Sequence, residues 1–139
     1  MTTGPPTLFP SLRYRDAPAA IEWLVRVLRF EIHAVIDGPD NTIAHAELKL
    51  GNGMIMLGSD VQREGVPSQS PGHGWNYIVL EDVDAHHDHA KREGAKIAME
   101  LTSTDYGSRD YAVRDLEGNL WNFGTYNPFA QGSSLQQLT

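Results

Sequence analysis

The sequence has 139 residues, the length of one domain or of two small modules that share a core. It contains no cysteine, which excludes disulfides, thiolate metal sites and a cysteine nucleophile. Eleven basic residues against eighteen acidic ones give a net charge of −7, which disfavours nucleic acid and anionic membranes as partners. We find neither a membrane-crossing apolar run nor a signal-peptide pattern, and we expect a cytoplasmic protein.

The first half of the chain predicts the order strand, helix, strand, strand, strand. Alternating residues predict a strand over 7–14, and Asp16 is a typical N-cap for the helix that follows. Gly51-Asn52-Gly53 is typical of a hairpin turn. The remaining strands of this half are predicted over 30–36, 43–50 and 54–57.

The second half predicts the same order again. A helix begins after Asp82 or Asp84 and ends at Gly94, and the strands are predicted over 75–80, 96–101, 111–114 and 120–126. We therefore divide the chain into a flexible N-terminus, a first βαβββ module, a polar linker, a second βαβββ module and a C-terminal tail. These parts cover 1–6, 7–58, 59–72, 73–126 and 127–139.

The two modules can be laid on each other without a gap. At one common offset Asp16 falls on Asp82, Ala19 on Ala85, and Gly58 on Gly124. The agreement of element order and turn position indicates a duplicated unit more strongly than the few identities do. The alternative is a generic α+β domain with accidental internal similarity.

Two stretches resemble the vicinal-oxygen-chelate family, which includes glyoxalases and bleomycin-resistance proteins. They are the helix start Asp82-Val-Asp-Ala-His86 and the segment 106–126, which contains the last two predicted strands. The resemblance implies an α+β fold in which two βαβββ modules pair their sheets around a cup-shaped cavity. By the same analogy we expect a homodimer.

In this family the metal-dependent members place one ligand on the first strand and one on the last strand of each module. On this chain those positions are Phe9, Met56, Trp75 and Asn122, and a slip of one residue offers no better ligand. A divalent metal needs converging imidazole or carboxylate groups, which this set lacks. We therefore expect no metal and no cofactor.

The same four positions predict an apolar pocket, since Phe9, Met56 and Trp75 share the cup side of their strands with Asn122 as an orienting polar group. The alternative is that these side chains fill a collapsed cup. Trp121 and Phe123 have the opposite phase and are assigned to the core. The complete predicted ligand-binding set is Phe9, Ser11, Met56, Trp75, Tyr77, Tyr106, Arg109 and Asn122.

The resemblance favours a protein that binds a small apolar or aromatic molecule, with an antibiotic as one candidate, and that performs no turnover. The first alternative is a metal-independent lyase, isomerase or hydrolase with Glu47, or one of Tyr77, Tyr106 and Tyr111, in acid–base work. For Glu47 we favour the interpretation as a solvated outer-face carboxylate or as the cross-strand partner of a lysine. The second alternative is a metal-dependent glyoxalase or dioxygenase whose ligands lie elsewhere.

The histidines at 86, 87 and 89 lie on one predicted helix. Two imidazoles three residues apart on a helix are near each other, but a zinc site needs further ligands and an enclosing surface. We expect either His86 or His87 to pack beside Val83 and Ala90, with the other histidines in solvent.

Overall fold

The computed structural model describes residues 6–67 and 69–129 and contains two successive strand–helix–strand–strand–strand modules. The first module consists of β1 (Ser11–Tyr14), α1 (Ala17–Leu28), β2 (Glu31–Asp37), β3 (Ile43–Leu50) and β4 (Gly53–Ser59). The second module consists of β5 (Trp75–Val79), α2 (Val83–Arg92), β6 (Lys96–Ser103), β7 (Arg109–Arg114) and β8 (Leu120–Gly124).

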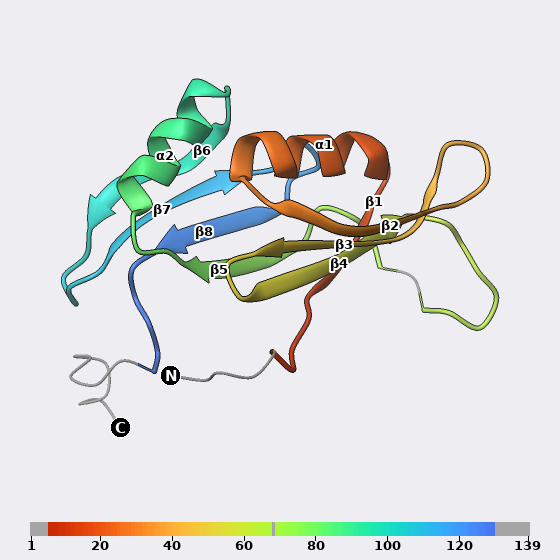
Figure 1. Cartoon of the computed structure of the whole chain (residues 1–139), viewed down its shortest axis with the longest axis horizontal. Helices are drawn as coiled ribbons and strands as arrows, with labels where there is room; N and C mark the ends of the chain where they lie inside the picture. The colour runs from red at the N-terminus through yellow and green to blue at the C-terminus, as the bar shows by residue number, and fades with distance from the viewer. Residues whose placement is uncertain (1–5, 68, 130–139) are drawn as a thin grey trace. The chain divides into compact units, whose positions relative to one another are not determined.

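Each module forms its own four-stranded sheet, in the order β1-β4-β3-β2 and β5-β8-β7-β6. The first strand of each module pairs in parallel with the last strand, and the other pairs are antiparallel. Within each module the helix lies over one face of the sheet (Figure 1). The predicted α+β fold of two βαβββ modules is therefore confirmed. No helix in the described part of the chain is long and apolar enough to cross a membrane.

The two helices begin in the same way. The Asp16 side chain accepts a hydrogen bond from the Ala19 backbone N–H at 3.1 Å, and the Asp82 side chain accepts one from Ala85 at 3.0 Å. Both aspartates are therefore N-caps, and of the two candidates in the second module Asp82 is the cap. After α2 the chain turns at Gly94, whose φ of 88° is a left-handed conformation that glycine adopts without strain.

The gapless superposition of the modules is wrong by one residue. Four residues separate the paired Lys49 and Met54, whereas five separate the paired Arg114 and Leu120, so the second hairpin is one residue longer. As a result, Met56 lies opposite Glu47 on β3, but its counterpart Asn122 lies opposite Ala112 on β7. The chemistry of the two sheets therefore differs at this position.

The strand ends also differ from the sequence prediction. β1 begins at Ser11 rather than at residue 7, because Pro10 has no N–H for a ladder hydrogen bond, although its carbonyl still accepts one from Met56. The connection between the predicted strands 96–101 and 111–114 is shorter than expected, since β6 and β7 continue their pairing to Ser103 and Arg109.

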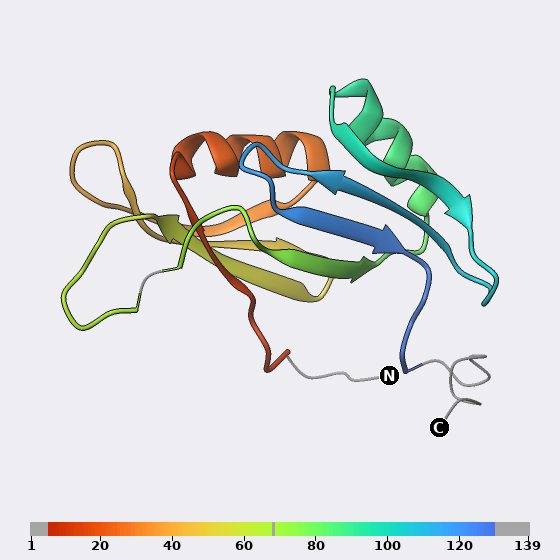
Figure 2. The ribbon, with the colours of Figure 1, turned by 180° about the vertical axis from the view of Figure 1, so that it is seen from behind.

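Long-range contacts divide the described chain into two compact units that differ from the two modules. One unit contains residues 6–74 with the turn 115–119, and the other contains 75–114 and 120–129. The turn is attached through Asp115, which accepts a hydrogen bond from the Tyr14 hydroxyl at 2.5 Å, and through Glu117, which accepts the N–H groups of Arg15 and Asp16. In Figure 2 the chain after β4 loops outward, and its end, residues 69–74, returns beside β1.

Each unit buries the helix-facing side of its sheet. In the first unit the core is formed by α1 residues such as Leu24, Val27 and Leu28, against Leu12, Leu48 and Leu57 of the sheet. In the second unit Tyr111, Val113, Trp121 and Phe123 are completely buried, together with Val83 and Ala90 of α2. The prediction that Trp121 and Phe123 belong to the core is confirmed.

Candidate functional site

The helix-free face of the second sheet carries exposed aromatic side chains. Trp75, Tyr77 and Val79 alternate along β5 and are 72%, 40% and 44% exposed. Their neighbours on β8 with the same phase are Leu120, Asn122 and Gly124, since Trp75 pairs with Leu120 and Tyr77 with Asn122. The edge strand β5 thus presents a row of apolar and aromatic groups opposite the face that α2 covers.

Trp75 is the most exposed of these side chains, and its orientation is fixed by a hydrogen bond. Its indole Nε1–H donates to Asn122 Oδ1 at 2.7 Å. The polar edge of the indole is therefore satisfied while most of its surface stays in contact with water. A large exposed aromatic held in one orientation is suited to stack with a planar molecule.

Tyr77 is held by polar groups at the next position along β5. Its hydroxyl donates to Asp110 Oδ1 at 3.2 Å and accepts the backbone N–H of Tyr126 at 2.9 Å. Burial raises the pKa of Tyr77 to about 12, so the phenol is neutral at physiological pH. Any side chain at Gly124 would overlap the Asp110 carboxylate and the Tyr77 hydroxyl, so this arrangement requires glycine there.

Tyr106 lies beside this group and Arg109 does not. The Tyr106 ring contacts the Tyr126 ring edge to face, with 5.9 Å between centroids. Arg109 has the phase of the buried Tyr111 and forms an ion pair with Asp84 of α2, with Nε to Oδ1 at 2.8 Å. This hydrogen bond lowers the pKa of Asp84 and raises that of Arg109. Of the predicted ligand-binding residues in the second module, the structure brings Trp75, Tyr77 and Asn122 onto the helix-free face. Tyr106 lies in the β6–β7 loop beside Tyr126, and Arg109 lies on the helix side.

The helix-free face of the first sheet carries the other predicted residues. Ser11 of β1 pairs with Met56 of β4, as Tyr77 pairs with Asn122 in the second sheet. Phe9 is 39% exposed and lies two residues before Ser11, outside the strand ladder. Phe9 borders a pocket of about 310 Å³ at the β3–β4 hairpin, which is lined by Pro6, Phe9, His33, Lys49, Gly51, Asn52, Gly53 and Met54.

Glu47 lies on this same face between two histidines. His45 Nε2 is 2.8 Å from Glu47 Oε2, and His33 Nε2 is 3.8 Å from Glu47 Oε1. The Glu47 side chain is 29% exposed. The predicted cross-strand lysine partner of Glu47 is wrong, because the carboxylate instead contacts His45 of its own strand and His33.

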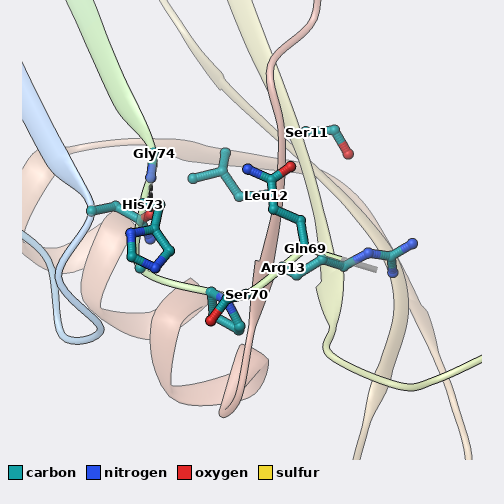
Figure 3. Close-up of a pocket in the computed structure, with 10 residues that line it drawn as sticks. Ser11, Leu12, Arg13, Gln69, Ser70, His73 and Gly74 are labelled. Carbon is teal, nitrogen blue, oxygen red and sulfur yellow. Dashed lines mark hydrogen bonds between the residues drawn. The ribbon is translucent and has the colours of Figure 1, made fainter. Parts of the chain in front are cut away.

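A second crevice, of about 80 Å³, lies between β1 and the returning segment 69–74 (Figure 3). Leu12 and Arg13 form one wall, and His73 and Gly74 form the other; the Gly74 N–H donates to Asn119 Oδ1 at 2.7 Å. A methyl group at Gly74 would lie 3.0 Å from Leu12 Cδ2, which shows how closely these segments pack. The crevice has room for only a few water molecules, and we do not assign a ligand to it.

The helix α2 buries both His86 and His87, not only one of them as expected. The His86 Nδ1 atom lies 2.6 Å from the Tyr111 hydroxyl, and its ring lies 4.2 Å from that of Phe123. His87 Nε2 lies 2.9 Å from Glu100 Oε1. Tyr111 is completely buried, and burial raises its pKa, so it is not positioned to act on a ligand.

The residues at the family's metal positions do not fit a metal. The strand positions hold Phe9, Met56, Trp75 and Asn122, and the Asn122 amide oxygen already accepts the Trp75 indole N–H. Within residues 6–67 and 69–129 no three histidine or carboxylate groups are placed so that they could hold a metal ion. We therefore derive no chemistry through a metal.

Sequence reasoning missed Lys49, His33 and Asp110. Lys49 and His33 meet Phe9 at one pocket although they lie on different strands, and Asp110 contacts Tyr77 across the second sheet. The alternation of β3 does place Glu47 and Lys49 on the face opposite the buried Leu48, which is the one available signal.

Comparison with known proteins agrees with this architecture. Residues 7–123 match the model of the glyoxalase/bleomycin resistance protein/dioxygenase superfamily. Uncharacterised proteins of Mycobacterium bovis and Mycobacterium tuberculosis are 30% identical to the chain over 125 residues, which cover 86% of this chain and 82% and 74% of theirs.

Among solved structures, TioX from Micromonospora sp. ML1 is similar, with 32% identity, a TM-score of 0.76, and coverage of 86% of this chain and 98% of TioX. A glyoxalase I variant from Zea mays shares the fold, with 21% identity, a TM-score of 0.67, and coverage of 86% of this chain and 44% of that protein. The family match spans nearly all of the described residues, and it includes both modules. The chain therefore belongs to the glyoxalase/bleomycin resistance protein/dioxygenase superfamily.

Proposed function

We propose that this protein binds a small, largely apolar or aromatic molecule without using a metal, with an antibiotic as one candidate ligand. The observation that carries the proposal is Trp75, a 72% exposed indole held by Asn122 on the helix-free face of its sheet. We further propose that the protein is cytoplasmic and homodimeric, by analogy with its superfamily, and that its modules have the boundaries 7–58 and 73–126.

The physical basis is the gain from covering the aromatic surface. A planar ligand on Trp75 removes apolar surface from water at roughly 25 cal/mol per Å² and gains about 0.5–1.5 kcal/mol from offset stacking. Because the indole N–H is already bonded, the ligand does not have to satisfy it. Tyr77 and the Asn122 amide lie on the same face as Trp75 and supply polar groups that select an orientation.

The first prediction tests this anchor with the neutral fluorescent probe phenylnaphthylamine. Trp75→Ala should weaken probe binding by about 2 kcal/mol or more, as expected for an aromatic anchor. The affinity is measured by fluorescence titration of the wild-type and variant proteins. Because the Trp75 side chain is mainly exposed, the variant should remain folded in a parallel denaturant titration.

The matched control is Phe129→Ala, which removes another exposed aromatic, 86% exposed, outside the strands. This variant should bind the probe as the wild type does. Equal affinities of Trp75→Ala and wild type, or equal losses in both variants, would contradict the assignment of Trp75 as the binding aromatic.

A second candidate function rests on the His45–Glu47 pair. The Glu47 carboxylate is hydrogen-bonded to the His45 imidazole at 2.8 Å on the helix-free face of the sheet. A carboxylate–imidazole pair is a common general acid–base arrangement, and it suits a metal-independent lyase or isomerase. Tyr77 is less suited as a base, because its pKa of about 12 keeps it protonated. Turnover of a bound ligand that is lost in Glu47→Gln would favour this function over binding alone.

A further inference from the structure

We infer that the pocket at the β3–β4 hairpin binds a planar aromatic molecule that carries an anionic group, such as a carboxylate or sulfonate. This inference concerns a site made of other residues than the Trp75 surface, and it goes beyond the proposed binding function. It is carried by a pocket whose lining combines an apolar part with the Lys49 ammonium and the Asn52 amide and includes no carboxylate.

The pocket has the size and the apolar surface for an aromatic ring. Its volume is about 310 Å³, which lies in the range of small-molecule sites. Phe9 and Met54 supply a ring and a thioether, and Pro6 extends the apolar part. Aromatic and thioether groups both make favourable contacts with a planar π system.

The polar part of the lining favours an anion. Lys49 shares the helix-free face with its cross-strand neighbour Met54 and lines the pocket together with His33 and Asn52. Glu31 pairs with Lys49 across β2 and β3, but in the described part of the chain the Lys49 ammonium forms no ion pair with a carboxylate. The ammonium is therefore available to an acidic ligand, to which Asn52 can add an amide N–H.

Glu47 is the nearest carboxylate to His33, at 3.8 Å, and it does not line the pocket. It also contacts His45 at 2.8 Å, so it is shared between two imidazoles. With a net charge of −7, the protein as a whole repels anions. Selective binding of an anion therefore requires a local cation, and Lys49 supplies one inside an apolar pocket.

The experiment compares two probes that share an aromatic frame. Anilinonaphthalene sulfonate carries one negative charge, and phenylnaphthylamine lacks the sulfonate. We expect Lys49→Gln to weaken binding of the sulfonate about three- to tenfold, because an ionic contact is lost. The affinity for the neutral probe should not change, because this probe carries no charge that could lose a contact. Phe9→Ala should weaken sulfonate binding as well, because the aromatic frame loses its ring contact. Both substitutions are at accessible side chains, and folding is checked by circular dichroism.

Two controls separate a local contact from general electrostatics. Lys96→Gln removes the same charge from an exposed lysine on β6, and Lys49→Arg keeps the charge in place. Both should bind the sulfonate within about twofold of wild type. Equal effects of Lys49→Gln and Lys96→Gln, or no effect of either, would overturn the inference. If Trp75→Ala still weakens binding of the neutral probe in that case, the proposed binding function stands. If neither probe binds the wild-type protein, both the proposed function and this inference fail.

Discussion

Trp75 and Trp121 lie on adjacent strands and have opposite environments. Trp121 is completely buried, whereas Trp75 is 72% exposed on the other face of the sheet. Strand alternation alone assigned Trp121 to the core, because a period of two places alternate residues on opposite faces. The same rule could not show that Asn122 bonds the Trp75 indole, since that contact depends on the register of β5 against β8.

Tyr77 provides a prediction about pH. Burial raises the pKa of its phenol from 10.0 to about 12. The folded protein thus holds this proton more tightly than the unfolded chain, so the contribution of Tyr77 to stability is complete below pH 10 and is lost as pH rises towards 12. Phenolate absorbance is measured against pH for the wild type and for Tyr77→Phe. The difference between the two curves, which is the signal of Tyr77, should therefore appear near pH 12.

The control for that titration is the urea-unfolded pair of proteins, in which the difference should appear near the ordinary tyrosine pKa of about 10. A difference near pH 10 in the folded pair as well would show that the Tyr77 hydroxyl is solvated. It would then also lack the contacts with Asp110 and Tyr126 described above.

At the scale of elements, the turn between β7 and β8 joins the second module to the first. Asp115 is buried and accepts hydrogen bonds from the Tyr14 hydroxyl, the Asn119 side chain and the backbone N–H groups of Glu117 and Asn119. The strands predicted over 111–114 and 120–126 leave residues 115–119 for a connection. The sequence could not predict that the turn packs with β1, since nothing local in residues 115–119 specifies a distant partner.

Asp115→Ala should lower the free energy of unfolding by roughly 2–4 kcal/mol, because it leaves the buried Tyr14 hydroxyl and Asn119 amide without this acceptor. Urea denaturation measures the change. Asp105→Ala, at an exposed aspartate in the β6–β7 loop, should change stability by less than about 0.5 kcal/mol. Similar stabilities for both variants would show that Asp115 does not hold the turn in place.

The helix α2 shows where hydrophobic patterning fails. Its core positions include His86 and His87, which sequence reasoning divides between core and solvent because histidine is intermediate in burial preference. Both are buried because the strands below provide polar partners, Tyr111 for His86 and Glu100 for His87. Those partners are more than ten residues away in sequence, so the helix alone could not reveal them.

For the whole molecule, the duplicated fold was predictable because it depends on repeated local signals: two N-cap aspartates, two hairpin turns and alternating strands. The pocket at the β3–β4 hairpin was not predictable, because Phe9, His33 and Lys49 come from three separate segments. The extra residue in the second hairpin was also missed, since few residues are identical between the modules and a single gap leaves the element order unchanged.

If a planar ligand contacts Trp75 as we propose, the three tryptophans of the chain allow a direct test. Each indole N–H gives one proton–nitrogen resonance, and Trp75→Phe identifies the signal of Trp75. Trp23 and Trp121 are 6% and 0% exposed, so they serve as internal controls. On titration with neutral naphthylmethanol, the Trp75 resonance should shift to saturation while the other two stay in place. A stationary Trp75 resonance at a probe concentration that saturates binding would show that the ligand does not contact Trp75.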